Sequence, residues 1–177
     1  DTSISANTDD TLVIEAGGNT MATITATTFT INDGTTITTA DNTDTLTLIS
    51  TDADANVGPV LNLYRNSSSP ADDDDAGRIH FTSNDSGGNA TTFATIRTVV
   101  GDVTDGTEDI QVLHQQVIAG TNVNTMRIKP DEIVLNDSSI DLDFRVESNG
   151  NTHMLFVDGG NNHVSIGGTT LEGGDVL

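Results

Sequence analysis

The chain has 177 residues and a formal net charge of −21, from 27 acidic and 6 basic residues, with 3% aromatic residues and no Trp or Cys. So strong a negative field repels nucleic acids and anionic lipids, and the lack of Cys excludes disulfides and thiolate metal sites. No apolar run approaches the ~18 residues needed to cross a bilayer. From the charge we therefore expect no nucleic-acid binding, and from the lack of a long apolar run no membrane insertion. One chain with so few large side chains has little apolar area to offset its ordering entropy. Disorder is one consequence of such a shortage, and packing against other copies of the same chain is the other.

Apolar and polar residues alternate with a period of two, which is the pattern of strands. The pattern therefore favours packing against other copies of the chain over disorder. No window has the pattern of an amphipathic helix, so the predicted fold class is all-β. Turn clusters such as Asn32–Gly34 and Asp158–Asn161 separate the alternating stretches and suit tight hairpins. In chain order, the expected strands are Thr11–Glu15, Thr45–Ile49, Val60–Tyr64, Arg78–Thr82, Phe93–Val100, Ile110–Val117, Thr125–Ile128, Ile133–Leu135 and Ile140–Glu147.

An internal repeat links the two ends of the chain. Thr30–Thr38 aligns with Val134–Asp141, because each has a strand end, an Asn-Asp turn and a new strand. Self-similar β units of this kind suggest stacked modules, since one unit cannot bury its own face. Residues 1–50 and 131–177 are therefore predicted to be repeat-like shaft segments. Residues 51–130, which hold four stronger strands, are predicted to form a compact β module between them.

Two groups of segments resemble modules of tail-fibre and related virion proteins of tailed bacteriophages. The first module has a G-R-I-x-F strand, an A-x-I strand, a D-G-T-E-D turn and an M-R-I strand. These elements stand here at Gly77–Phe81, Ala94–Ile96, Asp105–Asp109 and Met126–Ile128. The second is similar to fibre repeats of the form D-F-R-V-E-S…L-F-V-D-G…V-G-I-G, common in marine phages. Its matching segments are Asp143–Ser148, Leu155–Gly159 and Val164–Gly167.

The resemblance implies an elongated, interwoven homotrimer with a β-prism-like or triple-β-helix-like shaft, placed on the virion surface. In such a fibre the alternating apolar positions of three chains meet around a common axis. Other virion proteins, and a host surface glycan or protein, are the implied partners besides the chain itself. The residues predicted for the trimer core are Ile79, Phe81, Ile96, Val112, Ile128, Leu142, Phe144 and Val146.

Metal sites have weak sequence signals. Four consecutive carboxylates have the oxygen ligands that Ca²⁺ takes, but consecutive residues point in different directions, which favours a solvated loop. Asp158–Asn162 resembles half of a calcium-binding nonapeptide without its tandem repetition, so we interpret it as a turn. The histidines lack zinc-type spacing; in a trimer, His80 or His114 could meet its symmetry mates on the axis. The acidic candidates are Asp72, Asp73, Asp74 and Asp75.

No cofactor and no catalytic residue is predicted. The chain lacks a G-x-S-x-G elbow and a phosphate-binding glycine loop, and its scarce Trp and Tyr argue against a sugar-stacking groove. The leading hypothesis is a tail-fibre segment that supports or takes part in host attachment. A capsid-surface fibre or decoration protein, and a bacterial or archaeal surface adhesin, are the alternatives. Receptor contact, if it occurs in this segment, is expected at the polar loops Ser67–Asp75 and Asp85–Asn89.

Overall fold

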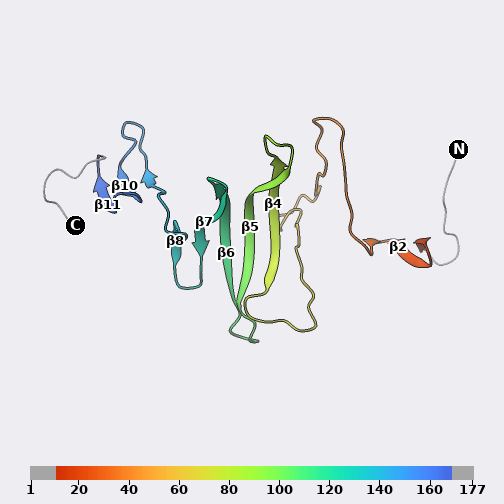
Figure 1. Cartoon of the computed structure of the whole chain (residues 1–177). Coiled ribbons are helices and arrows are strands. Elements are labelled where there is room, and N and C mark those ends of the chain that lie inside the picture. Colours follow the sequence, from red (N-terminus) through yellow and green to blue (C-terminus); the bar gives the residue numbers. More distant parts are fainter. Residues whose placement is uncertain (1–10, 169–177) are drawn as a thin grey trace. The chain divides into compact units, whose positions relative to one another are not determined.

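The structure is a computed structural model that describes residues 11–168. These residues form eleven strands and no helix, which confirms the predicted all-β class. The strands make three antiparallel sheets, none of them closed into a barrel (Figure 1). Contacts group the chain into two units, Asp1–Val60 and Leu61–Leu177. The three-part division and the trimeric shaft stay predictions.

The first unit contains a three-stranded sheet of β1 (Leu12–Ala16), β2 (Asn19–Ile24) and β3 (Phe29–Ile31), in that order. A two-residue turn joins β1 to β2, and both of its residues, Gly17 and Gly18, have positive φ angles of 61° and 79°. Two consecutive positive φ values are the requirement of a type I′ hairpin turn, which glycine meets at little cost.

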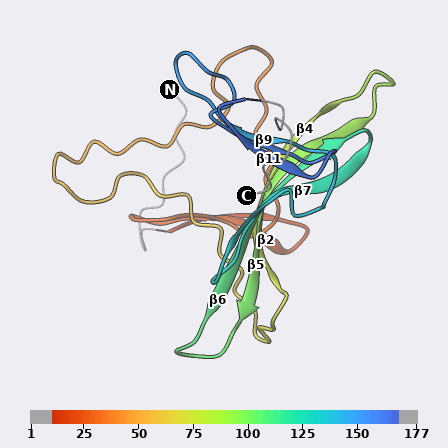
Figure 2. The ribbon, with the colours of Figure 1, turned by 90° about the vertical axis from the view of Figure 1, so that its left-hand side faces the viewer.

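The largest sheet lies in the second unit and follows the chain as an antiparallel meander (Figure 1). Its two longest loops are polar, and its shortest turn has positive φ angles at both of its residues, Ala119 and Gly120. Register shifts occur in four places along the sheet, and such bulges increase the twist that is visible in Figure 2. The strands, in order, are β4 (Asp75–Asn84), β5 (Ala90–Asp102), β6 (Asp109–Ile118), β7 (Thr121–Ile128) and β8 (Ile133–Leu135).

A second three-stranded sheet follows in the same unit. It consists of β9 (Phe144–Val146), β10 (Leu155–Asp158) and β11 (His163–Ile166), with β10 in the centre. Phe156 on β10 is buried and lies edge-on to His153 and His163, with ring centroids 5.0 and 6.0 Å away. This aromatic cluster covers one face of the sheet.

Two expected strands are absent from the single chain. Thr45–Ile49 and Val60–Tyr64 are free of ladder pairing, and the strand expected at Ile140–Glu147 is reduced to β9. The predictions for the first two segments were wrong for the isolated chain, because alternation selects the face of a strand but does not supply a neighbour. The exposed fractions of Leu46 and Tyr64 are 63% and 75%.

The two halves of the predicted repeat share one backbone feature. After β3, the amide of Asn32 donates to the carbonyl of Met21 on β2, at 3.1 Å. After β8, the amide of Asn136 donates to the carbonyl of Thr125 on β7, at 2.8 Å. In both places the Asn amide therefore adds one bond beyond the strand, and after β8 the amide of Ser138 adds another, to the carbonyl of Asn124. The repeat itself stays a prediction.

Little of the described chain forms a core. Twenty-five large hydrophobic side chains are exposed, and none of the described side chains is less than 2% accessible. Backbone ladders and cross-strand pairs therefore hold the sheets together more than burial does. The buried hydrophobic residues of the described part are Ala22, Val99, Leu113, Val123 and Phe156.

Candidate self-association surface

One side of the five-stranded sheet carries mainly apolar side chains. Residues two apart on a strand share a side, so the register assigns two adjacent rows to it. The first row, from β4 to β8, is Ile79, Ile96, His114, Met126 and Leu135. The second row is Gly77, Thr98, Val112, Ile128 and Ile133. We call these two rows, together with Phe81 of β4, the apolar face.

The apolar face lies open to solvent along both of its outer strands. On β4 the exposed fractions of Ile79 and Phe81 are 40% and 54%, and on β8 that of Ile133 is 67%. Contiguous apolar patches of this kind are uncommon on monomeric soluble proteins and mark interaction surfaces. The apolar face is therefore the best candidate functional surface of the chain.

Most of the predicted core residues lie together on this face. Their roles in a trimer stay predictions, but their common placement is what such a core requires. Reasoning from the sequence missed Met126, Ile133 and Leu135, although Ile133–Leu135 was expected to be a strand; the register across β7 and β8 is the signal that adds them. The five predicted residues on the apolar face are Ile79, Phe81, Ile96, Val112 and Ile128.

The other predicted core residues belong to the β9–β11 region. Phe144 and Val146 are 37% and 45% exposed and point to the same side of the sheet. Leu142 precedes β9, and its backbone lies against Gly159. The structure thus gives this sheet an open apolar side of its own, whose two rows are Phe144, Val157 and Val164, and Val146, Leu155 and Ile166.

The opposite side of the five-stranded sheet is polar and is organised by one carboxylate. Asp75 accepts a hydrogen bond from Nε of Arg97 through Oδ1 and another from Nη2 of Arg78 through Oδ2. The hydrogen bond from Arg97, and then that from Arg78, hold the pKa of Asp75 below its ordinary value of 3.8, against the opposing effect of burial. Leu113, the most buried of the described hydrophobic residues, pairs in register with Arg97 and Arg127 on this side. The aliphatic stems of the two arginines can cover Leu113 while their guanidinium groups stay among polar groups and solvent.

The lowered pKa of Asp75 predicts a loss of stability in acid. A carboxylate whose pKa is depressed in the folded state contributes stability above its unfolded pKa, near 3.8, and that contribution disappears as the pH falls through the folded value. We therefore expect the unfolding free energies of the native protein and of Asp75→Asn to converge below about pH 4. Urea titrations of both proteins from pH 7 to pH 2 measure this difference. A gap that stays constant over the whole range would contradict the prediction.

All six basic residues of the chain are engaged in ion pairs within it. The carboxylates that they meet are five of the chain's 27, because Asp75 serves two arginines. No Lys or Arg is thus left to neutralise a second molecule, and the surplus charge remains on the surface. The pairs are Arg65–Asp74, Arg78–Asp75, Arg97–Asp75, Arg127–Asp137, Lys129–Glu132 and Arg145–Glu147.

The acidic run before β4 has partners within the protein. Asp72 accepts a hydrogen bond from the amide of Val103 at 3.0 Å, and Asp74 accepts one from the amide of Ala71 at 3.1 Å. Asp73 has a positive φ angle of 66°, which turns the chain into β4. Among residues 11–168 no group of three or more acidic or histidine side chains is placed to hold a metal ion. The side chains of Asp72, Asp74 and Asp75 thus hold the loop and the polar side of the sheet, while Asp73 contributes its backbone conformation.

The two axial candidates lie on opposite sides of the sheet. His114 belongs to the apolar face, between Ile96 and Met126. His80 is one residue past Ile79, so it faces the polar side, where its Nδ1 lies 3.1 Å from the hydroxyl of Thr95. An axis lined by the apolar face would therefore meet His114 and not His80.

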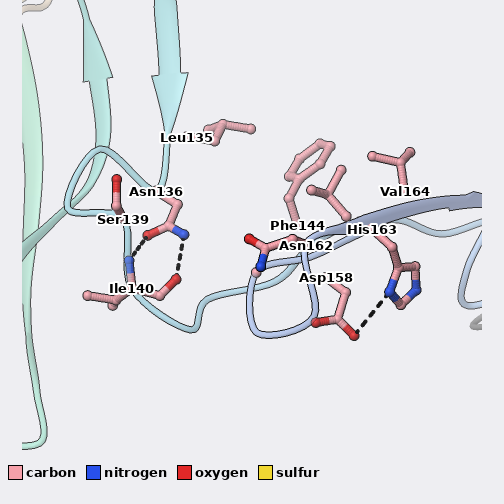
Figure 3. A pocket seen from close by; sticks show the side chains of 11 residues that line it. Leu135, Asn136, Ser139, Ile140, Phe144, Asp158, Asn162, His163 and Val164 are labelled. Carbon is pink, nitrogen blue, oxygen red and sulfur yellow. Dashed lines mark hydrogen bonds and ion pairs between the residues drawn. The ribbon is translucent and has the colours of Figure 1, made fainter. Parts of the chain in front are cut away.

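A cavity of about 420 Å³ lies beside the β10–β11 hairpin (Figure 3). Apolar and polar residues line it in similar numbers, and several of the polar groups are engaged in turns. Asn136 donates through Nδ2 to the carbonyl of Ile140 at 2.7 Å and accepts from its amide at 3.1 Å. Asp158 lies 3.8 Å from Nδ1 of His163, and its pKa is lowered mainly by a hydrogen bond from the Asn161 side chain. These contacts stabilise the turns, including the Asp158–Asn162 turn predicted from the sequence.

Gly159 is required for the close packing of this region. A Cβ atom there would lie 2.6 Å from the carbonyl oxygen of Leu142, so backbone would have to move. We expect Gly159→Ala to destabilise the β9–β11 sheet by about 1–3 kcal/mol, measured by amide exchange of β10. Gly150→Ala is the matched control, because a Cβ there meets no atom within 4 Å. Equal effects of the two changes would refute this role.

The predicted contact loops have well-defined turn chemistry. At the β4–β5 tip, Oδ1 of Asp85 accepts from the amides of Gly87 and Asn89, at 2.8 and 2.9 Å. These bonds and the Asn89 side chain lower the pKa of Asp85. In the other loop, the amide of Ser69 donates to the hydroxyl of Ser67 at 3.1 Å. Both loops present polar groups to solvent, and receptor contact at either one stays a prediction.

No family model, no curated protein and no solved structure resembles the chain closely enough to assign it to a family. Within the described residues, no helix is long and apolar enough to cross a membrane.

Proposed function

We propose that the chain is a non-enzymatic, structural segment of a bacteriophage tail fibre that assembles as a homotrimer on the virion surface. The observation that carries self-association is the open apolar face of the five-stranded sheet, together with 25 exposed large hydrophobic side chains among residues 11–168. Burial of that face against other copies would supply the core that one chain lacks. The phage assignment is supported by the sequence segments that resemble fibre modules.

The second apolar side, on the β9–β11 sheet, supports the same proposal. Phe144 and Val146 lie in the segment that resembles the D-F-R-V-E-S repeat, and both remain exposed in the single chain. In an interwoven fibre they would face the shared axis. The polar loops Ser67–Asp75 and Asp85–Asn89 would then remain outside, where other virion proteins or a host glycan or protein can reach them.

Native mass spectrometry of the intact protein tests the assembly, and a trimer is expected. A stable folded monomer at micromolar concentration would refute it. Electron cryomicroscopy of an intact particle tests the location, and density on the tail is expected. Density on capsomers would instead identify a decoration protein. Assembly on a cell surface, with melting that shifts when Ca²⁺ is chelated, would identify an adhesin.

A further inference from the structure

The five-stranded sheet ends on one side in a long strand with a free edge. β4 has ten residues and pairs with β5 alone. From Arg78 to Asn84 it makes no backbone hydrogen bond outside that ladder among the described residues. In an antiparallel strand the amides and carbonyls alternate between the two edges, so about half of these groups point away from β5. Such an edge is a template for another strand.

The other edge strand of the sheet is much shorter than β4. β8 has three residues, and the chain after it continues alongside β7. There the amides of Asn136 and Ser138 donate to the carbonyls of Thr125 and Asn124, at 2.8 and 3.2 Å. β4 therefore offers the longer template of the two edge strands, with ten residues against three.

A strand-like segment without a partner lies in the same unit. Residues Leu61–Tyr64 alternate apolar and polar side chains, make no backbone hydrogen bond and belong to no strand. Leu61, Leu63 and Tyr64 are 61%, 48% and 75% exposed. The alternation matches that of β4, where Ile79 and Phe81 point to the apolar face and the residues between them to the polar side.

The distribution of charge also favours a contact between Leu61–Tyr64 of one copy and the β4 edge of another. Each copy carries a net charge of −21, so two copies repel one another wherever carboxylates meet. Neither Leu61–Tyr64 nor the part of β4 from Ala76 to Asn84 contains an acidic residue. Two copies can therefore approach along this edge without bringing carboxylates together.

We propose that Leu61–Tyr64 of one copy adds as a strand to the free edge of β4 in a second copy. The inference rests on the proposed self-association and specifies how it occurs. The donor segment and the acceptor edge are different surfaces, so the contact is heterologous and can close into a ring of three. Leu61 and Leu63 extend the apolar face beyond β4, while Asn62 and Tyr64 extend the polar side.

Within one chain the donor segment is held at the beginning of β4. A Cβ built on Gly77 would lie 3.2 Å from Cβ of Leu63, and Nη1 of Arg65 donates to the carbonyl of Asp75 at 3.2 Å. These contacts leave the edge from Arg78 onward uncovered. A strand from another copy can therefore occupy it.

Amide exchange on the intact protein tests the pairing. Alternate amides from Arg78 to Asn84 are expected to exchange at least about tenfold more slowly in the oligomer than in the chain dissociated by dilution. Asn62→Pro removes a strand amide and should abolish this protection and weaken association about tenfold or more. Val57→Pro, in an exposed segment outside the donor that belongs to no strand, is the matched control and should change neither property.

The outcomes separate this inference from the proposed function. An oligomer whose β4 edge exchanges as fast as in the dissociated chain would overturn the edge pairing and leave self-association intact. Protection that persists in the dissociated chain would mean pairing within one molecule and would also overturn it. A protein that stays monomeric would overturn both. Unchanged association and protection in Asn62→Pro would exclude Leu61–Tyr64 as the donor.

Discussion

Replacing Phe81 with Asp is expected to abolish self-association while the five-stranded sheet stays folded. Phe81 is 54% exposed in the single chain, so its loss removes little burial from the monomer. In the assembled protein the same position would place a carboxylate in an apolar contact. The expected loss of association free energy is at least about 2 kcal/mol for each chain, because the burial of one large apolar side chain no longer contributes. Sedimentation equilibrium measures the change.

Two further variants isolate the cause. Phe81→Lys removes the apolar side chain but reduces the net negative charge instead of increasing it. If the apolar contact is decisive, this variant should disrupt assembly as Phe81→Asp does; if added repulsion is decisive, it should not. Thr82→Asp adds the same charge at the next residue of β4, which is exposed and bonded to the hydroxyl of Thr92. It should weaken assembly much less. Full assembly of Phe81→Asp would exclude the apolar face as the association surface.

Asp75→Asn is expected to lower the unfolding free energy of the sheet by about 2–3 kcal/mol. The change leaves the guanidinium groups of Arg78 and Arg97 without their common carboxylate, on side chains that are 43% and 28% exposed. Arg97 is the more costly loss, since it is the less accessible of the two. Urea unfolding at one fixed protein concentration measures the effect, because association would otherwise contribute to the stability.

Asp73→Asn is the control for this loss. Asp73 lies two residues earlier in the same acidic run, with a φ angle of 66° and no side-chain hydrogen bond or ion pair in the described chain. Asn adopts this backbone region at least as readily as Asp, so the expected change is within about 0.5 kcal/mol. If both substitutions cost the same, net charge and not the Arg78–Asp75–Arg97 cluster would govern stability.

Alternation in the sequence predicted several of the strands that find neighbours within the chain, but it missed the short strands β2, β3, β10 and β11. It also predicted strands in two segments that have no neighbour. Arg78–Thr82 and Phe93–Val100 became β4 and β5, because a short turn returns one strand onto the other. Thr45–Ile49 and Val60–Tyr64 have equally clear alternation, but the single chain gives them no ladder. Alternation describes which side of a strand is apolar, whereas pairing depends on contacts distant in sequence.

The sequence identified several residues of the apolar face but not which of them lie next to one another. The alternating positions identified Ile79 and Ile96, yet their common row required the register between β4 and β5. The same register places His80 and His114 on opposite sides, a distinction that two separate strands cannot show. The role of Asp75 was also hidden, because a run of four carboxylates gives no sign of which one will meet two arginines.

If the chain forms the proposed fibre, the internal pairing of every Lys and Arg has a consequence for many such fibres on one particle. Each assembled shaft would present carboxylates all around and no free cation, so neighbouring shafts would behave as parallel polyanionic rods. Their mutual repulsion acts over a distance of about 8 Å at physiological ionic strength and further in fresh water. Such rods would keep apart at low ionic strength, and concentrated salt or multivalent counterions would let them approach one another.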